Sequence, residues 1–198
     1  MTRIELGNII PRWEWRTFGE DFGVAEENIK KHECTRVLES SEIYFLSNKS
    51  DQNIKVRNDL MDIKVLEEVN GEALEQWVPV MKASFPIENP EITDVLANAN
   101  IELEVGENLS LSLEDFIAKI IDPNPDLKAV GVFKKRYGYM INEAVVELAD
   151  LTIDGKPIRT TAVEHADEEL VISVVKDLGL YGLENVNYIQ AMKRLVKF

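Results

Sequence analysis

Basic side chains recur at alternate positions along this chain, a spacing that could build an anion-binding surface. Lys55 and Arg57 lie two residues apart, and Lys134 and Arg136 repeat that spacing. Alternate residues of a β-strand point to the same face of a sheet, so each pair would present its two cations together. A guanidinium pairs with phosphate oxygens through two parallel hydrogen bonds. The pattern therefore indicates a site for a phosphate-bearing anion, and a triphosphate is the natural guest.

An acidic residue accompanies a further basic one near the start of the chain. Residues 12–18 read Arg-Trp-Glu-Trp-Arg-Thr-Phe, which places Glu14 and Arg16 on one face of a strand and the two tryptophans on the other. The apolar faces need a core, so the charged faces have two destinations. They are the solvated side of an open sheet, or they line the inside of a closed one. A closed sheet brings like charges together and requires internal carboxylates or a bound anion to compensate them.

The composition narrows the class of protein. The chain has 198 residues and a formal net charge of -14, which argues against binding a nucleic-acid duplex. A single cysteine, Cys34, cannot form an internal disulfide. Neither a secretory leader nor an apolar run long enough to span a membrane is recognisable, so a cytoplasmic location without membrane contact is expected. A monomer and a homodimer both stay open.

The elements that must position these charges form one α+β domain over residues 1–198. Alternation predicts strands at 12–18, 54–57, 62–69, 128–137, 139–151 and 158–165, two short strands within 35–47, a hairpin turn at Asp154-Gly155 and a brief strand at 101–104. Helices are predicted at 72–83, 91–97, 112–121, 167–178 and 184–198. A helical insert over about residues 70–125 and closing helices over 167–198 would then flank a large antiparallel sheet, which about eight strands could close into a barrel. Trp13, Trp15 and Trp77 are expected to anchor the outer packing.

At these residues the chain resembles the CYTH, or triphosphate tunnel metalloenzyme, superfamily, which includes class IV adenylyl cyclases, thiamine triphosphatases and inorganic triphosphatases. The family opens with E-x-E-x-K, and the matching segment here is Arg12-Trp-Glu14-Trp-Arg16. The two basic pairs and Lys64 match later family strands in order. The acidic strands are matched by Val146-Glu147-Leu-Ala-Asp150 and by Glu164-His-Ala166.

The resemblance implies a closed eight-stranded antiparallel β tunnel with helices packed outside. It assigns catalysis to Glu14, Arg16 and Lys64, substrate binding to Lys55, Arg57, Lys134, Arg136 and Arg12, and Mg²⁺ or Mn²⁺ ligation to Glu14, Glu147 and Glu164, with Asp150 as a further carboxylate. Arg12 and Ala166 stand where the family has Glu, which should weaken a divalent cation.

Three functions follow from the resemblance. The first is metal-assisted hydrolysis of a triphosphate or short polyphosphate. The second is a catalytically weak module that binds phosphoanions or nucleotides, and the third is nucleotide cyclisation of the adenylyl cyclase type. The replaced carboxylates favour the second.

Overall fold

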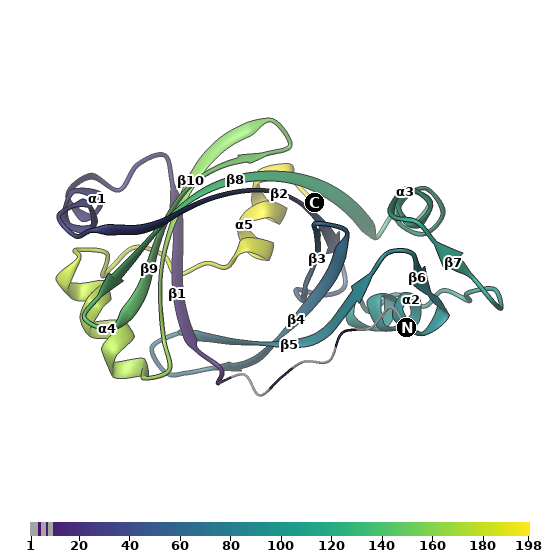
Figure 1. Ribbon diagram of the computed structural model, residues 1–198, viewed down its shortest axis with the longest axis horizontal. Helices are drawn as coiled ribbons and strands as arrows, with labels where there is room; N and C mark the ends of the chain where they lie inside the picture. Colours follow the sequence, from purple (N-terminus) through teal and green to yellow (C-terminus); the bar gives the residue numbers. More distant parts are fainter. Residues whose placement is uncertain (1–3, 5–6, 8–9) are drawn as a thin grey trace.

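Eight antiparallel strands close into a barrel in the computed structural model, which describes residues 4, 7 and 10–198 (Figure 1). The first residues of the chain, where the sequence shows no recognisable secretory leader, lie largely outside the described residues. Around the barrel the strands follow the order β1-β10-β9-β8-β2-β3-β4-β5, so the predicted α+β tunnel is confirmed. Their bounds are β1 (Trp13–Gly19), β2 (Cys34–Ser47), β3 (Asn53–Arg57), β4 (Leu60–Val69), β5 (Glu75–Ser84), β8 (Leu127–Ile141), β9 (Ala144–Ile153) and β10 (Lys156–His165).

Three tight hairpins set the register of neighbouring strands, and one of them joins β8 to β9 through Asn142 and Glu143. Asp154 and Gly155 have φ values of 46° and 78° and join β9 to β10, which confirms the predicted turn. Asn58 and Asp59 join β3 to β4 with φ values of 52° and 55°. Positive φ at both central residues matches the twist of the flanking strands, so the alternation of inward and outward side chains is fixed on all three hairpins.

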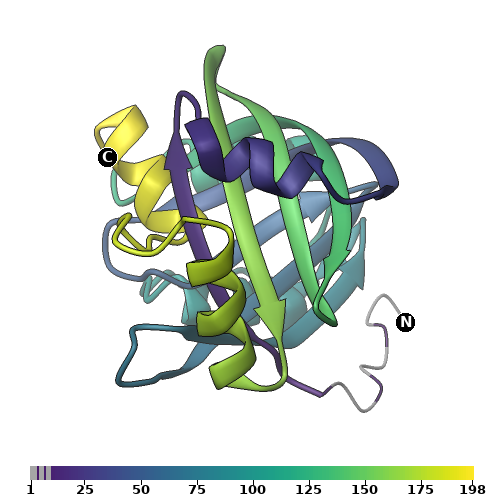
Figure 2. The same ribbon diagram turned by 90° about the vertical axis from the view of Figure 1, so that its left-hand side faces the viewer.

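Helices cover one outer face of the barrel beside β1, β9 and β10. Helices α1 (Gly23–Lys30) and α4 (Glu168–Asp177) lie across these strands in Figure 2. Trp15 packs in a cluster with Ile29 of α1 and Val174 of α4, and Trp13 contacts the same cluster. The outward placement of these two tryptophans is therefore confirmed, and it turns Glu14 and Arg16 toward the inside.

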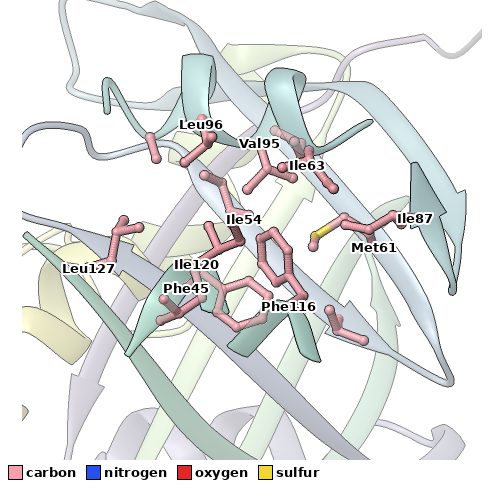
Figure 3. Packing of buried hydrophobic residues seen from close by; sticks show 14 of the residues in the cluster. Phe45, Ile54, Met61, Ile63, Ile87, Val95, Leu96, Phe116, Ile120 and Leu127 are labelled. Atoms are coloured by element: carbon pink, nitrogen blue, oxygen red, sulfur yellow. The ribbon is translucent and has the colours of Figure 1, made fainter. Parts of the chain in front are cut away.

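A second outer layer covers β2 to β5. It consists of α2 (Asn89–Asn98), α3 (Leu113–Phe116), a π-helical turn (Ile117–Ile121) and the small strands β6 (Ile87–Glu88) and β7 (Ser110–Leu111). Figure 3 shows Phe116 against Phe45, with ring centroids 5.3 Å apart, and Ile54 and Ile63 in the same cluster. Because Ile54 and Ile63 occupy the outer faces of β3 and β4, Lys55 and Lys64 point into the barrel.

The helix predicted over 72–83 is wrong, because this segment forms strand β5. Its helix-forming residues pair with β4 and, at Glu75 and Gln76, with β1, so tertiary pairing overrides the local preference. The helical insert therefore begins only after Ser84. Residues 101–104 form no strand, and the two short strands predicted within 35–47 are one continuous strand, β2.

The end of the chain closes a short seam in the barrel. Only Trp13 and Glu14 of β1 pair with β5. Beyond them the backbone of Arg16 is held by the tail, because its N–H donates to Asn185 Oδ1 and its carbonyl accepts from the Val186 N–H, both at 2.8 Å. Helix α5 (Tyr188–Val196) starts at this point, so its first residue enters the tunnel wall. Within the described residues no helix combines the length and apolarity needed to cross a bilayer.

Candidate functional site

The interior of the barrel holds a small charged cavity, here called the inner chamber, of about 140 Å³. Its charged lining consists of Arg16, Lys55, Lys64, Lys134, Arg136, Glu14, Glu147 and Glu164. A larger cavity of about 730 Å³, the vestibule, shares Glu14, Lys64, Trp77 and Glu164 with it. The chamber therefore communicates with the outside through its acidic side.

One end of the chamber is a basic cluster built around the carboxylate of Glu42. This side chain has no exposed surface and lies 3.1 Å from Lys134 Nζ and 3.5 Å from Lys55 Nζ. Guanidinium nitrogens lie 3.7 Å and 4.0 Å away, and they belong to Arg57 and Arg136. The two basic pairs singled out in the sequence thus meet inside the barrel, from β3 and β8, on a carboxylate supplied by β2.

The ionisation of the basic cluster is strongly perturbed. Burial alone would raise the pKa of Glu42, but Lys134 and Lys55 outweigh it and lower this pKa to about 2. Burial and the neighbouring Lys55 charge lower the pKa of Lys134 to about 7 despite Glu42. Burial also lowers the pKa of Lys55. The carboxylate is thus fixed as an anion, whereas the charge on Lys134 changes near neutral pH.

Two tyrosine rings enclose the Lys134 ammonium. Its Nζ donates a hydrogen bond of 2.7 Å to the Tyr44 hydroxyl and lies 3.8 Å from the centroid of the Tyr188 ring. The two rings are stacked with centroids 6.0 Å apart. Burial raises the pKa of both tyrosines, so they stay neutral. The ring faces stabilise the cation and fix its position.

At the other end of the chamber a guanidinium lies between two carboxylates. Arg16 Nε donates to Glu14 Oε1 at 2.5 Å, and Arg16 Nη1 donates to Glu147 Oε1 and to Thr160 Oγ1, both at 3.3 Å. Burial lowers the pKa of Arg16, but Glu14 more than offsets this and the net shift is strongly upward. Arg16 is therefore a permanent internal cation bridging β1 and β9.

Two more carboxylates lie beside this bridge. Strand register places Glu14 opposite Glu164 of β10 and opposite Glu75 of β5. Burial, followed by the Glu14 charge, raises the pKa of Glu164 to about 7. Burial also raises the pKa of Glu75, although Asn187 and Trp77 donate hydrogen bonds to it. This end of the chamber therefore carries surplus negative charge.

No protein-family model matches the chain, and neither does any curated protein. Solved structures do match in fold. A candidate adenylyl cyclase from Hippeastrum with a dominant triphosphatase activity aligns with a TM-score of 0.50 at 10% identity, over 92% of this chain and 95% of that one. A conserved hypothetical protein from Pyrococcus furiosus aligns with a TM-score of 0.50 at 15% identity, over 90% and 98%. A protein from Pyrococcus horikoshii OT3 gives 0.50 at 17%, over 90% and 97%.

These structural neighbours are CYTH-type proteins, and the chain shares their barrel fold. The resemblance noted at the basic strands is thus confirmed as a likeness of the whole barrel. At identities this low it concerns the fold alone, and the roles of individual residues rest on the geometry of this tunnel.

The carboxylates of this tunnel do not fit a divalent metal in their present arrangement. Within residues 4, 7 and 10–198, no group of three or more His, Cys, Asp or Glu side chains could hold one. Arg16 occupies Glu14 and Glu147 together, and Arg12 and Ala166 supply no carboxylate. Ligation of Mg²⁺ or Mn²⁺ by Glu14, Glu147 and Glu164 stays a prediction.

The other residues that the sequence singled out lie in different parts of the molecule. Lys64 lines both cavities, whereas Arg12 lies at the vestibule with a side chain 54% exposed, 3.9 Å from Glu164. Asp150 is not part of the chamber, because it accepts a 2.8 Å hydrogen bond from Arg159 in an ion-pair network with Glu26 of helix α1. The outer role expected for Trp77 is wrong, since its indole lines the chamber and donates to Glu75.

Several residues of the site were missed in the sequence. They are Glu42, Tyr44, Glu75, Asn187 and Tyr188. A signal existed for the first two, because Ile43 and Phe45 alternate with them and mark the outer face of the same strand. The last two come from a loop and a helix start, whose approach to the barrel seam leaves no mark in strand periodicity.

Proposed function

We propose that the tunnel binds the triphosphate or short polyphosphate group of a small molecule. The observation that carries this proposal is the basic cluster, in which four cations share one buried carboxylate. Even with Asp62 opposite Lys55, the carboxylates are fewer than the four cations, so the cluster retains an excess of positive charge that a polyanion would compensate. Arg57 and Arg136 offer the planar donors that suit phosphate oxygens.

The shape of the interior favours an extended anion. The inner chamber, of about 140 Å³, is small, and its lining continues from the basic cluster past Arg16 and Lys64 to the vestibule. A phosphate chain would lie in the chamber, with the organic part of the molecule in the vestibule of about 730 Å³ beside Trp77 and Met140. Sites of this size commonly bind small molecules.

Calorimetric titration with phosphate, pyrophosphate and tripolyphosphate tests this function. We expect the affinity to rise with chain length, because each phosphate adds charge that meets a further cation. Arg136→Gln should weaken tripolyphosphate binding at least about tenfold, the loss of one charged hydrogen-bonded contact. Lys135→Gln is the matched control, since the neighbouring Lys135 side chain is 40% exposed and pairs with Glu39. Equal affinity for all three anions would contradict the proposal.

Hydrolysis of the bound anion, assisted by Mg²⁺ or Mn²⁺, is the second candidate. Glu164 favours this candidate. Its carboxylate lines both the chamber and the vestibule, and its pKa is about 7. A group with that pKa beside the bound phosphates has the properties of a general base. A bound divalent cation would offset charge on the phosphoryl oxygens. It would also require Glu14 and Glu147 to release Arg16. Phosphate release from tripolyphosphate with either metal, abolished by Glu14→Gln, would support this candidate, and its absence would leave binding alone.

A further inference from the structure

The position of Arg16 differs from that of an ordinary phosphate-binding arginine. Its guanidinium contacts Glu14, Glu147 and the hydroxyl of Thr160. The segment that closes the barrel seam holds its backbone on both sides, through Asn185 and Val186. The guanidinium carbon lies 4.5 Å from the centroid of the Tyr188 ring. The side chain is therefore fixed at several points, which an arginine waiting for a ligand does not need.

We infer that the Arg16 guanidinium is the resident cation of the acidic end, replaces a divalent metal there, and makes anion binding by this tunnel independent of metal. The part of this inference that concerns the anion rests on the proposed function. The part that concerns the cation does not, because it follows from the contacts of Arg16 alone.

The charges around the bridge support the replacement. A divalent cation approaching Glu14 and Glu147 would meet a buried, permanently charged guanidinium, 5% exposed, already placed between them. Displacing that guanidinium would leave it buried without its carboxylates, a costly state for a charge. Glu164, which lies opposite Glu14 in the strand register, pairs with Arg12 at 3.9 Å.

The length and shape of the side chain explain why arginine has this effect. Its fork contacts carboxylates on two strands at once, through Nε to β1 and Nη1 to β9. Lysine, which the family pattern has at this position, offers one nitrogen on a more flexible stem. Arg16→Lys should therefore keep the positive charge but release at least one of the two carboxylates.

Mn²⁺ binding followed by electron paramagnetic resonance, without any phosphate, tests the cation. We expect no saturable site in the wild-type protein and a new saturable Mn²⁺ site in Arg16→Lys, a gain that ordinary loss of an arginine contact would not produce. Arg159→Lys is the matched control, because Arg159 also lies between two carboxylates, Glu26 and Asp150, on the outside of the barrel. It should gain no such site. Melting curves of both variants confirm that they fold.

The wild-type titration decides the inference even if Arg16→Lys fails to fold. Saturable Mn²⁺ binding that Glu14→Gln abolishes would overturn it. Tripolyphosphate binding measured in a chelator and in Mg²⁺ tests the second half. We expect binding to persist in the chelator and Mg²⁺ not to strengthen it, because Mg²⁺ complexes the free anion and no metal bridges it to the protein. Binding that needs Mg²⁺ would overturn the inference while sustaining the proposed function. If tripolyphosphate binds in neither condition, the proposed function fails, and the Mn²⁺ titration still decides the role of Arg16.

Discussion

The two ends of the inner chamber are electrostatic opposites built on the same plan. At one end a buried carboxylate, Glu42, lies among four cations, and at the other a buried guanidinium, Arg16, lies between two carboxylates. Each end carries its own central counter-charge, so the barrel can fold around a charged interior before any ligand arrives. Neither end is electrically neutral. The end around Glu42 carries surplus positive charge, and the end around Arg16 carries surplus negative charge. An anion inside would therefore adopt one direction along the tunnel axis.

Glu42→Gln should have the largest effect on the basic end. It removes the charge that four cations share and leaves the buried Lys55 and Lys134 without their carboxylate, which we expect to lower the free energy of unfolding by about 3 kcal/mol. The same variant should be stabilised more than the wild type by tripolyphosphate, because the cluster gains net positive charge. Thermal melting with and without tripolyphosphate measures both effects.

Glu39→Gln provides the control for this variant on the same strand. Glu39 pairs with Lys135 at 3.1 Å, but its side chain is 55% exposed, so we expect a change below about 0.5 kcal/mol. If Glu42→Gln were as mild as Glu39→Gln, Glu42 would not hold the cluster together.

Glu164→Gln should show the opposite sign at the acidic end. The pKa of Glu164 is raised from 4.5 to about 7 in the folded protein, so the folded state binds its proton more tightly than the unfolded chain does. The stabilisation that protonated Glu164 gives the folded state is fully present at low pH and is lost as the pH rises from about 4.5 to about 7. Glutamine cannot ionise. Because the side chain is 30% exposed, we expect a gain of no more than about 2 kcal/mol at about pH 8 and none at about pH 4.

Denaturant unfolding at the two pH values measures this gain. Glu67→Gln serves as the control, since Glu67 is an exposed carboxylate on β4. Equal effects of the two substitutions at both pH values would show that the acidic end carries no surplus charge.

The basic end could be predicted from the sequence more fully than the acidic end. Lys55 and Arg57, and Lys134 and Arg136, alternate with residues of the outer face, so period-two reasoning put each pair on one face of a strand, and the family resemblance turned that face inward. The same reasoning extends to Glu42, because Ile43 and Phe45 later in its strand mark the outer face. The hairpin at Asp154-Gly155 also follows from local chemistry.

The acidic end depends on contacts that no local pattern records. Strand β5, which brings Glu75 beside Glu14, contains helix-forming residues, and only its pairing with β4 and β1 makes it a strand. Asn187 and Tyr188 reach the chamber because the tail fills a seam between distant strands. Whether a guanidinium bridges two carboxylates depends on side-chain reach between β1 and β9, which spacing along the chain does not determine.

The pH dependence of anion binding distinguishes the two ends further. Lys134 has a pKa of about 7 in the free protein, and a bound anion would favour its charged form. From about pH 6 to about pH 8 the protonated fraction falls roughly tenfold, so tripolyphosphate affinity should fall by about 1.4 kcal/mol from this group. Lys134→Met provides the comparison, because it keeps the stem and removes the titration. If both proteins show the same pH profile in calorimetry, the ligand alone titrates and Lys134 does not contribute.

The smallest effect is expected at the rim of the vestibule, where Arg12→Gln removes an exposed cation. The Arg12 side chain is 54% exposed and lies 3.9 Å from Glu164, so the free energy of unfolding should change by less than about 0.5 kcal/mol. An anion that reaches the basic cluster through the vestibule must first pass Glu14 and Glu164, and Arg12 offsets their repulsion. Stopped-flow association of tripolyphosphate at low ionic strength should therefore slow by about two- to threefold, and the difference should vanish at about 1 M salt, where charges are screened within about 3 Å. An association rate that does not respond to Arg12→Gln at low salt would mean that the anion does not enter past the acidic end, and the two ends would then differ in charge without ordering the path between them.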